Sequence, residues 1–381
     1  MRSTGIAVSL CVALLVGPTA SVPATPAPAP LAQSATAADA TARIVIAAQA
    51  VARSLDDAGR ATLQFRYDDT AQRTRWSNFP SGIFVRAGVR LGDLSPAQRQ
   101  AVMTLLETAL SSSGYRKVTG IMRADDVFRD TAAKNGPPGG GGGGRGPGGP
   151  PPGGAGPGGP GGPGGPGGGR AVAFGSNEYY LAFLGTPSTT APWMLQFGGH
   201  HLAVNLTLSG HAATLAPTHV GVQPASYTIE GRSVQPLGNE NSRAFALMAT
   251  LTAEQRGKAV LGYRVADLVL GPGKDGQSIQ PEGLIGSALT PAQQGMLMEI
   301  VREWAGLATD ALAAPRLDEI RGKLAQTYFA WSGTTTEGSA AYFRIQGPTL
   351  HIEFAPQDGV DHIHTIYRDP TNDYGAKITK K

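Results

Sequence analysis

The sequence of 381 residues contains a single cysteine, Cys11, and only 16% of its residues are charged. Cys11 lies in an apolar run near the N-terminus, so a chain cleaved after this run would carry no thiol. Disulfides, thiolate metal ligands and a cysteine nucleophile are then excluded. The remaining chain must be held together by core packing, for which its length is sufficient.

Several enzyme signatures are also missing. The chain has no H-E-x-x-H, no G-x-S-x-G and no phosphate-binding G-x-x-x-x-G-K-[ST] motif. Its net charge is only +4 and its basic residues are scattered, which does not fit a nucleic-acid-binding surface. We therefore expect no nucleic-acid partner.

Three segments are not expected to belong to the folded core: an N-terminal apolar segment and two segments of low complexity. Arg2, the apolar run from Gly5 to Gly17 and the small residues after it have the build of a secretory signal peptide, predicted over residues 1–24. The run is shorter than the roughly 20 residues that span a bilayer, so we expect no membrane association after cleavage. We predict a disordered Ala/Pro-rich leader over residues 25–42 and a disordered Gly/Pro-rich loop over residues 136–169, which have few side chains to bury.

Three segments share a helix-start pattern: "LSPAQRQAV", "LTAEQRGKAV" and "LTPAQQGML". Ser95, Thr252 and Thr290 suit N-caps, and Pro96 and Pro291 would occupy the first helical position. Apolar residues follow at helical spacing, which predicts amphipathic helices. The shared pattern has two interpretations, reuse of a favourable helix start or an internal repeat.

Strand-like runs rich in aromatic and branched residues occupy other parts of the chain. They are residues 178–185, 193–210 and 211–221, followed near the C-terminus by 327–333, 341–356 and 361–369. The second and third runs could form a hairpin turning at Ser209–Gly210. The mixture predicts an α+β fold in which N-capped amphipathic helices pack on a largely antiparallel sheet.

The chemistry-bearing residues are histidines in two clusters, "GGHHLAVNL" and "DHIHTIYRD". On a strand, His362 and His364 would project from one face, a spacing that suits a metal ligand pair. His200 and His201 would point to opposite faces, so only one could join them unless the strand is bulged. Glu353 is our candidate for a fourth ligand or a general base. Such a ligand set suits zinc, iron or copper.

Other interpretations of these residues remain open. The histidines could form an acid/base or ligand-binding site without metal, or could serve only as hydrogen-bonding core residues. His211, His219 and His351 are expected to be structural or at the surface. Arg344 and Arg368 lie in apolar strands, where each could pair with a carboxylate or clamp an anionic ligand.

The segments "PWMLQFGGHHLAVNLT", "YFRIQGPTLHIEF" and "DHIHTIYRDPTNDYG" resemble the domain-of-unknown-function family 3500, whose members are mostly bacterial and often exported. The resemblance runs from about Ala42 to the C-terminus. It implies a single domain over residues 43–381, with the Gly/Pro run as an insertion in a surface loop. It also implies that "GHH" and "HIH" occur together in the family, but it supplies no reaction.

These observations lead to two expectations about function. The first is an exported, metal-dependent enzyme, a hydrolase, located in the periplasm or outside the cell. The second is a non-catalytic module that uses the same histidines and arginines to hold a small-molecule or anionic ligand. Convergence of three ligand atoms on one point would favour the first.

Overall fold

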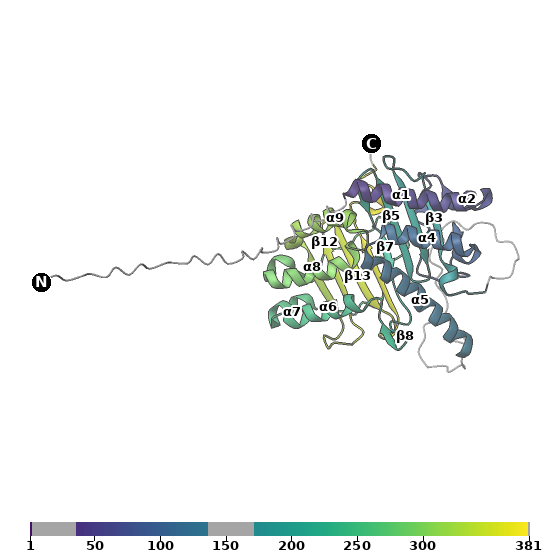
Figure 1. Ribbon diagram of the computed structural model, residues 1–381. Helices are drawn as coiled ribbons and strands as arrows, with labels where there is room; N and C mark the ends of the chain where they lie inside the picture. Colours follow the sequence, from purple (N-terminus) through teal and green to yellow (C-terminus); the bar gives the residue numbers. More distant parts are fainter. Residues whose placement is uncertain (2–35, 136–170, 380–381) are drawn as a thin grey trace. The chain divides into compact units, whose positions relative to one another are not determined.

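The strands predicted from branched and aromatic residues form one large sheet. In this computed structural model, twelve strands of the described residues pair in the order β1-β3-β4-β5-β7-β14-β13-β12-β11-β10, with β2 on β3 and β6 on β5 (Figure 1). All of these pairs are antiparallel except β1 with β3. The predicted α+β class is confirmed.

The outermost strands β1 and β10 have two residues each, and the interior strands have five to eight residues, except β7, which has three. Their bounds are β1 Gln64–Phe65, β2 Val89–Arg90, β3 Tyr180–Leu184, β4 Trp193–Gly199, β5 Leu202–Ser209, β6 Ala212–Thr214, β7 Thr218–Val220, β10 Leu284–Ile285, β11 Tyr328–Ser332, β12 Tyr342–Gly347, β13 Leu350–Pro356 and β14 Ile363–Arg368, with a separate hairpin of β8 Tyr227–Ile229 and β9 Arg232–Val234.

The helices begin where the sequence places capping residues. Ser95, Thr252 and Thr290 each form a capping box with the glutamine three positions later, as their spacing predicts. The helices are α1 Ala37–Ser54, α2 Asp57–Leu63, α3 Thr70–Arg73, α4 Pro96–Ala109, α5 Ser112–Asn135, α6 Gly238–Thr250, α7 Ala253–Ala259, α8 Pro291–Ala305 and α9 Asp310–Gly322, with single turns η1 Leu91–Asp93, η2 Ser176–Glu178, η3 Gly286–Ala288, η4 Leu324–Gln326 and η5 Asp373–Gly375.

The structure describes residues 36–135 and 171–379, together with Met1. The predicted signal peptide, apart from Met1, and the predicted Gly/Pro-rich loop lie outside the described residues. The predicted leader extends too far, because its last six residues already belong to α1. Thr36 and Asp39 form a capping box there, and alanine-rich sequence favours the helix. None of the described helices is long and apolar enough to cross a membrane.

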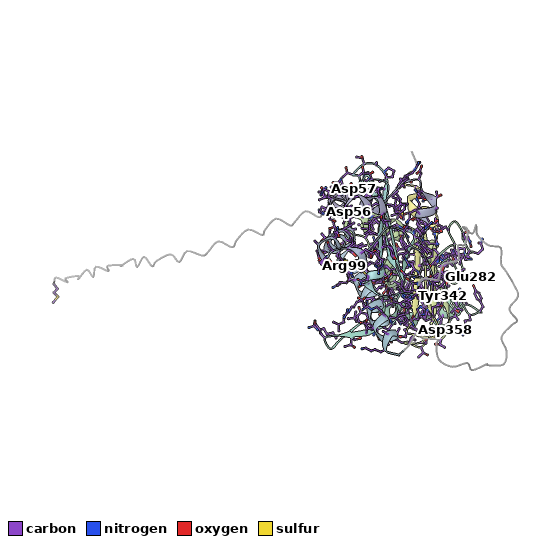
Figure 2. The ribbon with its side chains drawn as sticks, turned by 90° about the vertical axis from the view of Figure 1, so that its right-hand side faces the viewer. Asp56, Asp57, Arg99, Glu282, Tyr342 and Asp358 are labelled. Atoms are coloured by element: carbon purple, nitrogen blue, oxygen red, sulfur yellow. The ribbon has the colours of Figure 1, made fainter. Side chains whose placement is uncertain are left out.

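The two faces of the sheet differ in what covers them. The larger helices pack on one face, where Phe343 contacts Trp304 of α8 and Phe354 stacks on Phe343 (Figure 1). The opposite face carries the alternate residues of the strands, many of them polar, and is covered by loops. Glu282 and Tyr342 lie on this side and Asp57 and Arg99 on the helical side (Figure 2). The polar residues of the sheet therefore gather in a buried layer beneath loops.

Apart from the short elements β1, α3, β2, β6, β8, β9, β10 and η5, the same series of elements occurs twice in the described chain. The first series is α1, α2, η1, α4, α5, η2, β3, β4, β5 and β7, and the second is α6, α7, η3, α8, α9, η4, β11, β12, β13 and β14. Equivalent contacts repeat with them: Gln98 donates to the Ser54 carbonyl, and Gln293 donates to that of Thr250. The structure thus favours an internal repeat as the origin of the shared helix-start pattern.

The two series meet at the centre of the sheet. β7 and β14 pair antiparallel, with Ile366 opposite His219, and the turns after α4 and α8 form a bridge between Leu110 and Ala308. The sheet is therefore continuous across this seam between β7 and β14. Both histidine clusters lie at one end of the seam, because the β4–β5 turn and the start of β14 come together there.

Candidate metal centre

The first histidine cluster forms a tight turn between two strands. Gly199 of β4 pairs with Leu202 of β5, so His200 and His201 connect them. The prediction of one continuous strand over residues 193–210 is wrong at this point. The turn requires His201 to adopt a φ of 61°. It also brings the backbones of β4 and β5 close together. A Cβ atom on Gly198 would lie only 2.4 Å from the Leu202 carbonyl oxygen, so glycine is needed there.

The second cluster lies where the sequence pattern places it. His364 belongs to β14, and His362 directly precedes that strand. Their side chains lie on the same side, with ring centroids 4.7 Å apart. The period of two along an extended chain is the reason, since it returns every second side chain to one face.

The two clusters converge on one group of three rings. The Nε2 atoms of His201 and His362 are 2.8 Å apart, and one ligand nitrogen from each of His201, His362 and His364 lies within 4.8 Å of the others. Tetrahedral ligands at the usual zinc–nitrogen distance lie about 3.4 Å from one another, so ring shifts of about 1 Å or less would seat an ion. Without an ion, one of the two Nε2 atoms carries the hydrogen and donates a hydrogen bond to the other.

Asp267 orients the third ring of this group. Its carboxylate lies 3.2 Å from Nδ1 of His364, and the side-chain amide nitrogen of Asn78 lies 3.4 Å from Nε2 of the same ring. Metal-binding histidines characteristically use the second nitrogen in this way. Asp125 of α5 holds His200 similarly, at 2.7 Å from Nδ1, and the His200 ring stacks on His201 at a centroid distance of 3.7 Å. His200 therefore supports the group from outside.

Sequence reasoning does not identify either carboxylate. Asp125 is 75 residues from His200 along the chain, and Asp267 is 97 residues from His364. Neither forms part of a recognisable spacing, and Asp125 lies in a helix that the sequence connects to no site. Only the packing of α5 and of the loop before β10 brings them to the histidines.

Burial favours the neutral form of two rings of the group, His201 and His362. It lowers the pKa of His362 to about 4, with further effects from the neighbouring His364 and His200. Burial likewise holds the pKa of His201 well below its usual value. Neutral imidazole is the form that binds metal ions. His201 and His362 are thus in the form that binds a metal ion at neutral pH.

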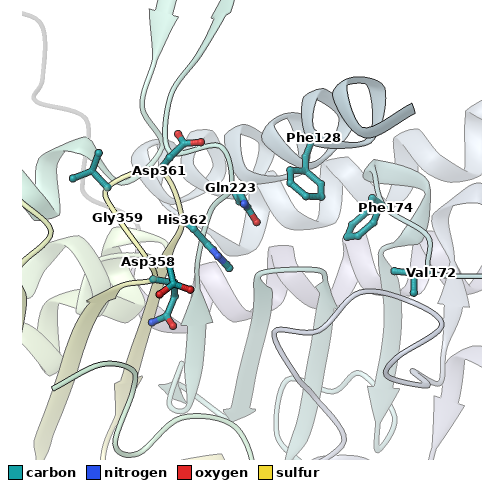
Figure 3. A pocket seen from close by; sticks show the side chains of 10 residues that line it. Phe128, Val172, Phe174, Gln223, Asp358, Gly359, Asp361 and His362 are labelled. Atoms are coloured by element: carbon teal, nitrogen blue, oxygen red, sulfur yellow. The ribbon is translucent and has the colours of Figure 1, made fainter. Parts of the chain in front are cut away.

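A cavity of about 960 Å³ opens beside the group. Its lining includes His362, so one of the three rings is accessible from it. Phe128 and Phe174 lie on one side, and Asp358 lies with His362 on the other (Figure 3). Catalytic metal sites typically combine three protein ligands with an open position, and this arrangement provides room for one.

A family model described as "protein of unknown function (DUF3500)" matches residues 37–376. The chain belongs to this family. The match covers almost all of the described residues and confirms the resemblance carried by the histidine-containing segments. No curated protein and no solved structure matches the chain.

Glu353 of this DUF3500 protein lies outside the histidine group. Its two carboxylate oxygens accept hydrogen bonds from the backbone N–H groups of Val269 and Leu270, from the Tyr342 hydroxyl and from the His351 ring, at 2.7–2.8 Å. The side chain is completely buried. These bonds occupy the carboxylate and anchor the loop before β10 to the sheet, so the structure does not bring Glu353 into the predicted role of fourth ligand or general base.

Arg344 and Arg368 are held by carboxylates rather than exposed to a ligand. Arg344 donates to Glu282 at 2.9 Å. Arg368 donates to Asp275 and Asp373 at 3.0 and 2.9 Å, and its other nitrogens donate to backbone carbonyls. Neither arginine lines the cavity beside the histidine group. Both placements match the alternative in which these residues form internal ion pairs.

His219 is a further buried histidine beside the group. It is fully buried, its ring centroid lies 5.8 Å from that of His364, and neither ring nitrogen has a hydrogen-bond partner among the described residues. Its Nε2 atom lies 3.1 Å from where a Cβ atom of Gly221 would be, so the missing side chain of that glycine makes room for the ring. His211, by contrast, is exposed.

Proposed function

We propose that this DUF3500 protein is a metal-dependent enzyme, a hydrolase, whose ion is held by His201, His362 and His364. The observation that carries the proposal is the convergence of three histidine ring nitrogens, from two distant segments, beside a large cavity. Structural histidines need no such convergence, since each can be satisfied by a separate partner. The donor set suits zinc, iron or copper.

The residues around the group have separate roles in this proposal. Asp267 fixes the orientation of His364, and His200 with Asp125 fixes the side of the turn that carries His201. The cavity admits the substrate next to His362. A bound divalent ion would lower the pKa of a coordinated water toward neutrality and so supply hydroxide for hydrolysis.

We also propose that the chain is exported to the periplasm or the cell exterior. The support is the three-part pattern of residues 1–24 and the absence of any cysteine after Cys11. A signal-bearing chain would lose its only thiol on cleavage, and an oxidising compartment would then impose no constraint on its folding.

A non-catalytic binding module is the second candidate. One observation favours it: Glu353 is fully engaged, and Asp267, the carboxylate beside the group, already contacts His364. The same cavity would then hold a small-molecule ligand without turnover.

Metal content measured by mass spectrometry tests the proposal. The mature chain is produced without a histidine tag, beside His362→Ala/His364→Ala and a control, His211→Ala, which removes an exposed histidine outside the group. We expect about one equivalent of zinc, iron or copper in the parent and in the control, and less than a tenth of that in the double variant.

Circular dichroism establishes that the double variant is folded. Metal-loaded parent protein then enters screens with ester, amide and phosphoester substrates. If the parent takes up no ion even after incubation with each metal, the metal-dependent enzyme is rejected. If the parent binds a metal ion but turns over no substrate in any screen, the non-catalytic binding module is favoured over the enzyme.

A further inference from the structure

The walls of the cavity beside the histidine group are of two kinds. Phe128 of α5 and Phe174 contact each other edge to face, with centroids 5.0 Å apart, and Val172 extends this apolar wall. The facing wall is the loop between β13 and β14, from Gln357 to His362 (Figure 3). The first wall offers aromatic and branched surface, and the second offers polar groups next to the proposed ion.

The apolar wall is accessible rather than packed away. Phe128 and Phe174 are only partly buried, although their rings contact each other, and Val172 is 48% exposed. Partly exposed aromatic rings that line a cavity present surface that a ligand can cover. The cavity volume of about 960 Å³ is in the range of small-molecule sites.

The polar lining carries charge of one sign. Asp358 and Asp361 contribute carboxylates, Gln223 and Gln357 contribute amides, and no lysine or arginine belongs to the lining among the described residues. Arg344 and Arg368, the arginines expected to bind an anion, are engaged elsewhere. In the metal-free protein, a ligand carboxylate or phosphate would thus meet like charge without a compensating cation from the chain. A bound divalent ion would offset part of that negative charge.

We propose that the cavity binds ligands that combine an aromatic or branched apolar group with an amine or hydroxyl group, and that in the metal-free protein it discriminates against anionic ligands. The apolar group packs on Phe128 and Phe174, and the amine or hydroxyl faces Asp358 and the amides. The inference rests on the proposed function, since it places the scissile bond of such a substrate beside His362. It replaces the earlier expectation of an anionic ligand.

Three probes of one shape separate charge from size. Benzylamine, benzyl alcohol and benzoate share a phenyl ring and differ in charge at neutral pH. Their binding is measured by saturation-transfer NMR on chelator-treated protein at low ionic strength, where charges are least screened. We expect benzylamine to bind about fivefold tighter than benzoate, with benzyl alcohol between them.

Two variants assign the effect to the two walls. Asp358→Asn/Asp361→Asn should bring benzylamine and benzoate within about twofold of each other, because the repelling charge is gone. Phe174→Ala should weaken all three probes alike. Asp318→Asn, at an exposed position on α9, is the matched control and should change nothing.

The outcomes separate this inference from the metal proposal. Equal or tighter binding of benzoate to the metal-free parent, or an order that survives in the double Asp variant, overturns the ligand class. Binding of benzylamine without metal uptake supports the ligand class while rejecting the metal centre. In cobalt-loaded protein, broadening of the benzylamine signals is expected, and its absence overturns the placement of the ligand beside His362.

Discussion

Two carboxylates near the histidines show how local contacts decide the role of a residue. Glu353 is completely buried and accepts four hydrogen bonds, whereas Asp267 is half-exposed and contacts His364. Burial opposes ionisation of Glu353, but bonds from His351 and from the loop backbone outweigh it and hold the pKa below its usual value. A carboxylate so held stabilises the fold and is poorly placed to accept a substrate proton.

Glu353→Gln tests this assignment. We expect a loss of about 2–4 kcal/mol in unfolding free energy, because an amide cannot accept all four bonds and one N–H group faces a donor. Denaturant unfolding of the parent, the variant and Glu337→Gln, an exposed control, measures the loss. A general base would instead leave stability intact and abolish turnover.

The difference in unfolding free energy between the parent and Glu353→Gln should depend on pH in a definite direction. Because the folded-state pKa of Glu353 is lowered, its stabilising contribution is fully present above the unfolded value of about 4.5. It is lost as the pH falls below that value. The gap in unfolding free energy between parent and Glu353→Gln should therefore narrow toward acid pH, and a gap that is constant from pH 7 to 3 would contradict the assignment.

At the level of elements, a buried lysine paired with two glutamates joins three helices. Lys117 of α5 donates to Glu240 of α6 and to Glu303 of α8. Glu240 is completely buried, and Glu303 also has Arg243 as a partner. Removing the lysine would leave Glu240 without a cation, whereas Glu303 would keep one. The packing of these three helices thus depends on the buried charge of Glu240, which is neutralised only because α5 brings Lys117 next to it.

Lys117→Met should destabilise the protein by about 3–5 kcal/mol, since it leaves a buried carboxylate unpaired. Lys117→Met/Glu240→Leu should recover most of that loss, because no buried charge remains. Thermal and denaturant unfolding of the single and double variants provide the measurement. If the double variant is as unstable as the single one, volume rather than charge determines the packing here.

The whole molecule places its histidine group where its two repeated halves meet. His201 comes from the first half and His362 and His364 come from the second, on either side of the seam between β7 and β14. An ion bound by all three would therefore connect the halves. It would bind the folded chain in preference to the unfolded one, in which the histidines are far apart.

Zinc should accordingly stabilise the entire fold. At a hundredfold excess over the dissociation constant we expect a gain of about 2.7 kcal/mol in unfolding free energy, from mass action alone. Calorimetry of chelator-treated parent with and without zinc measures the gain. His362→Ala/His364→Ala should show none, and His211→Ala should match the parent; equal stabilisation of all three would point to nonspecific binding.

Local sequence alone determined the features that depend on neighbouring residues. The helix starts at Ser95, Thr252 and Thr290 follow from side chains that cap the first turn, and the shared side of His362 and His364 follows from the period of an extended strand. Branched and aromatic runs likewise located the longer strands of the sheet, but not β1, β2 and β10. These features depend on interactions between residues close together in the chain, so they can be predicted from one sequence.

Tertiary structure alone decided the features that depend on distant partners. The turn at His200–His201 requires two strands to pair, the roles of Asp125 and Asp267 require segments far apart to pack together, and Glu353 is engaged by a loop some 80 residues earlier. No local pattern encodes such contacts, because they follow from the free energy of the complete packed chain. The sequence indicates the histidines of the candidate site. Which of them lie together, and which carboxylates hold them, is determined by the packing of the two halves against each other.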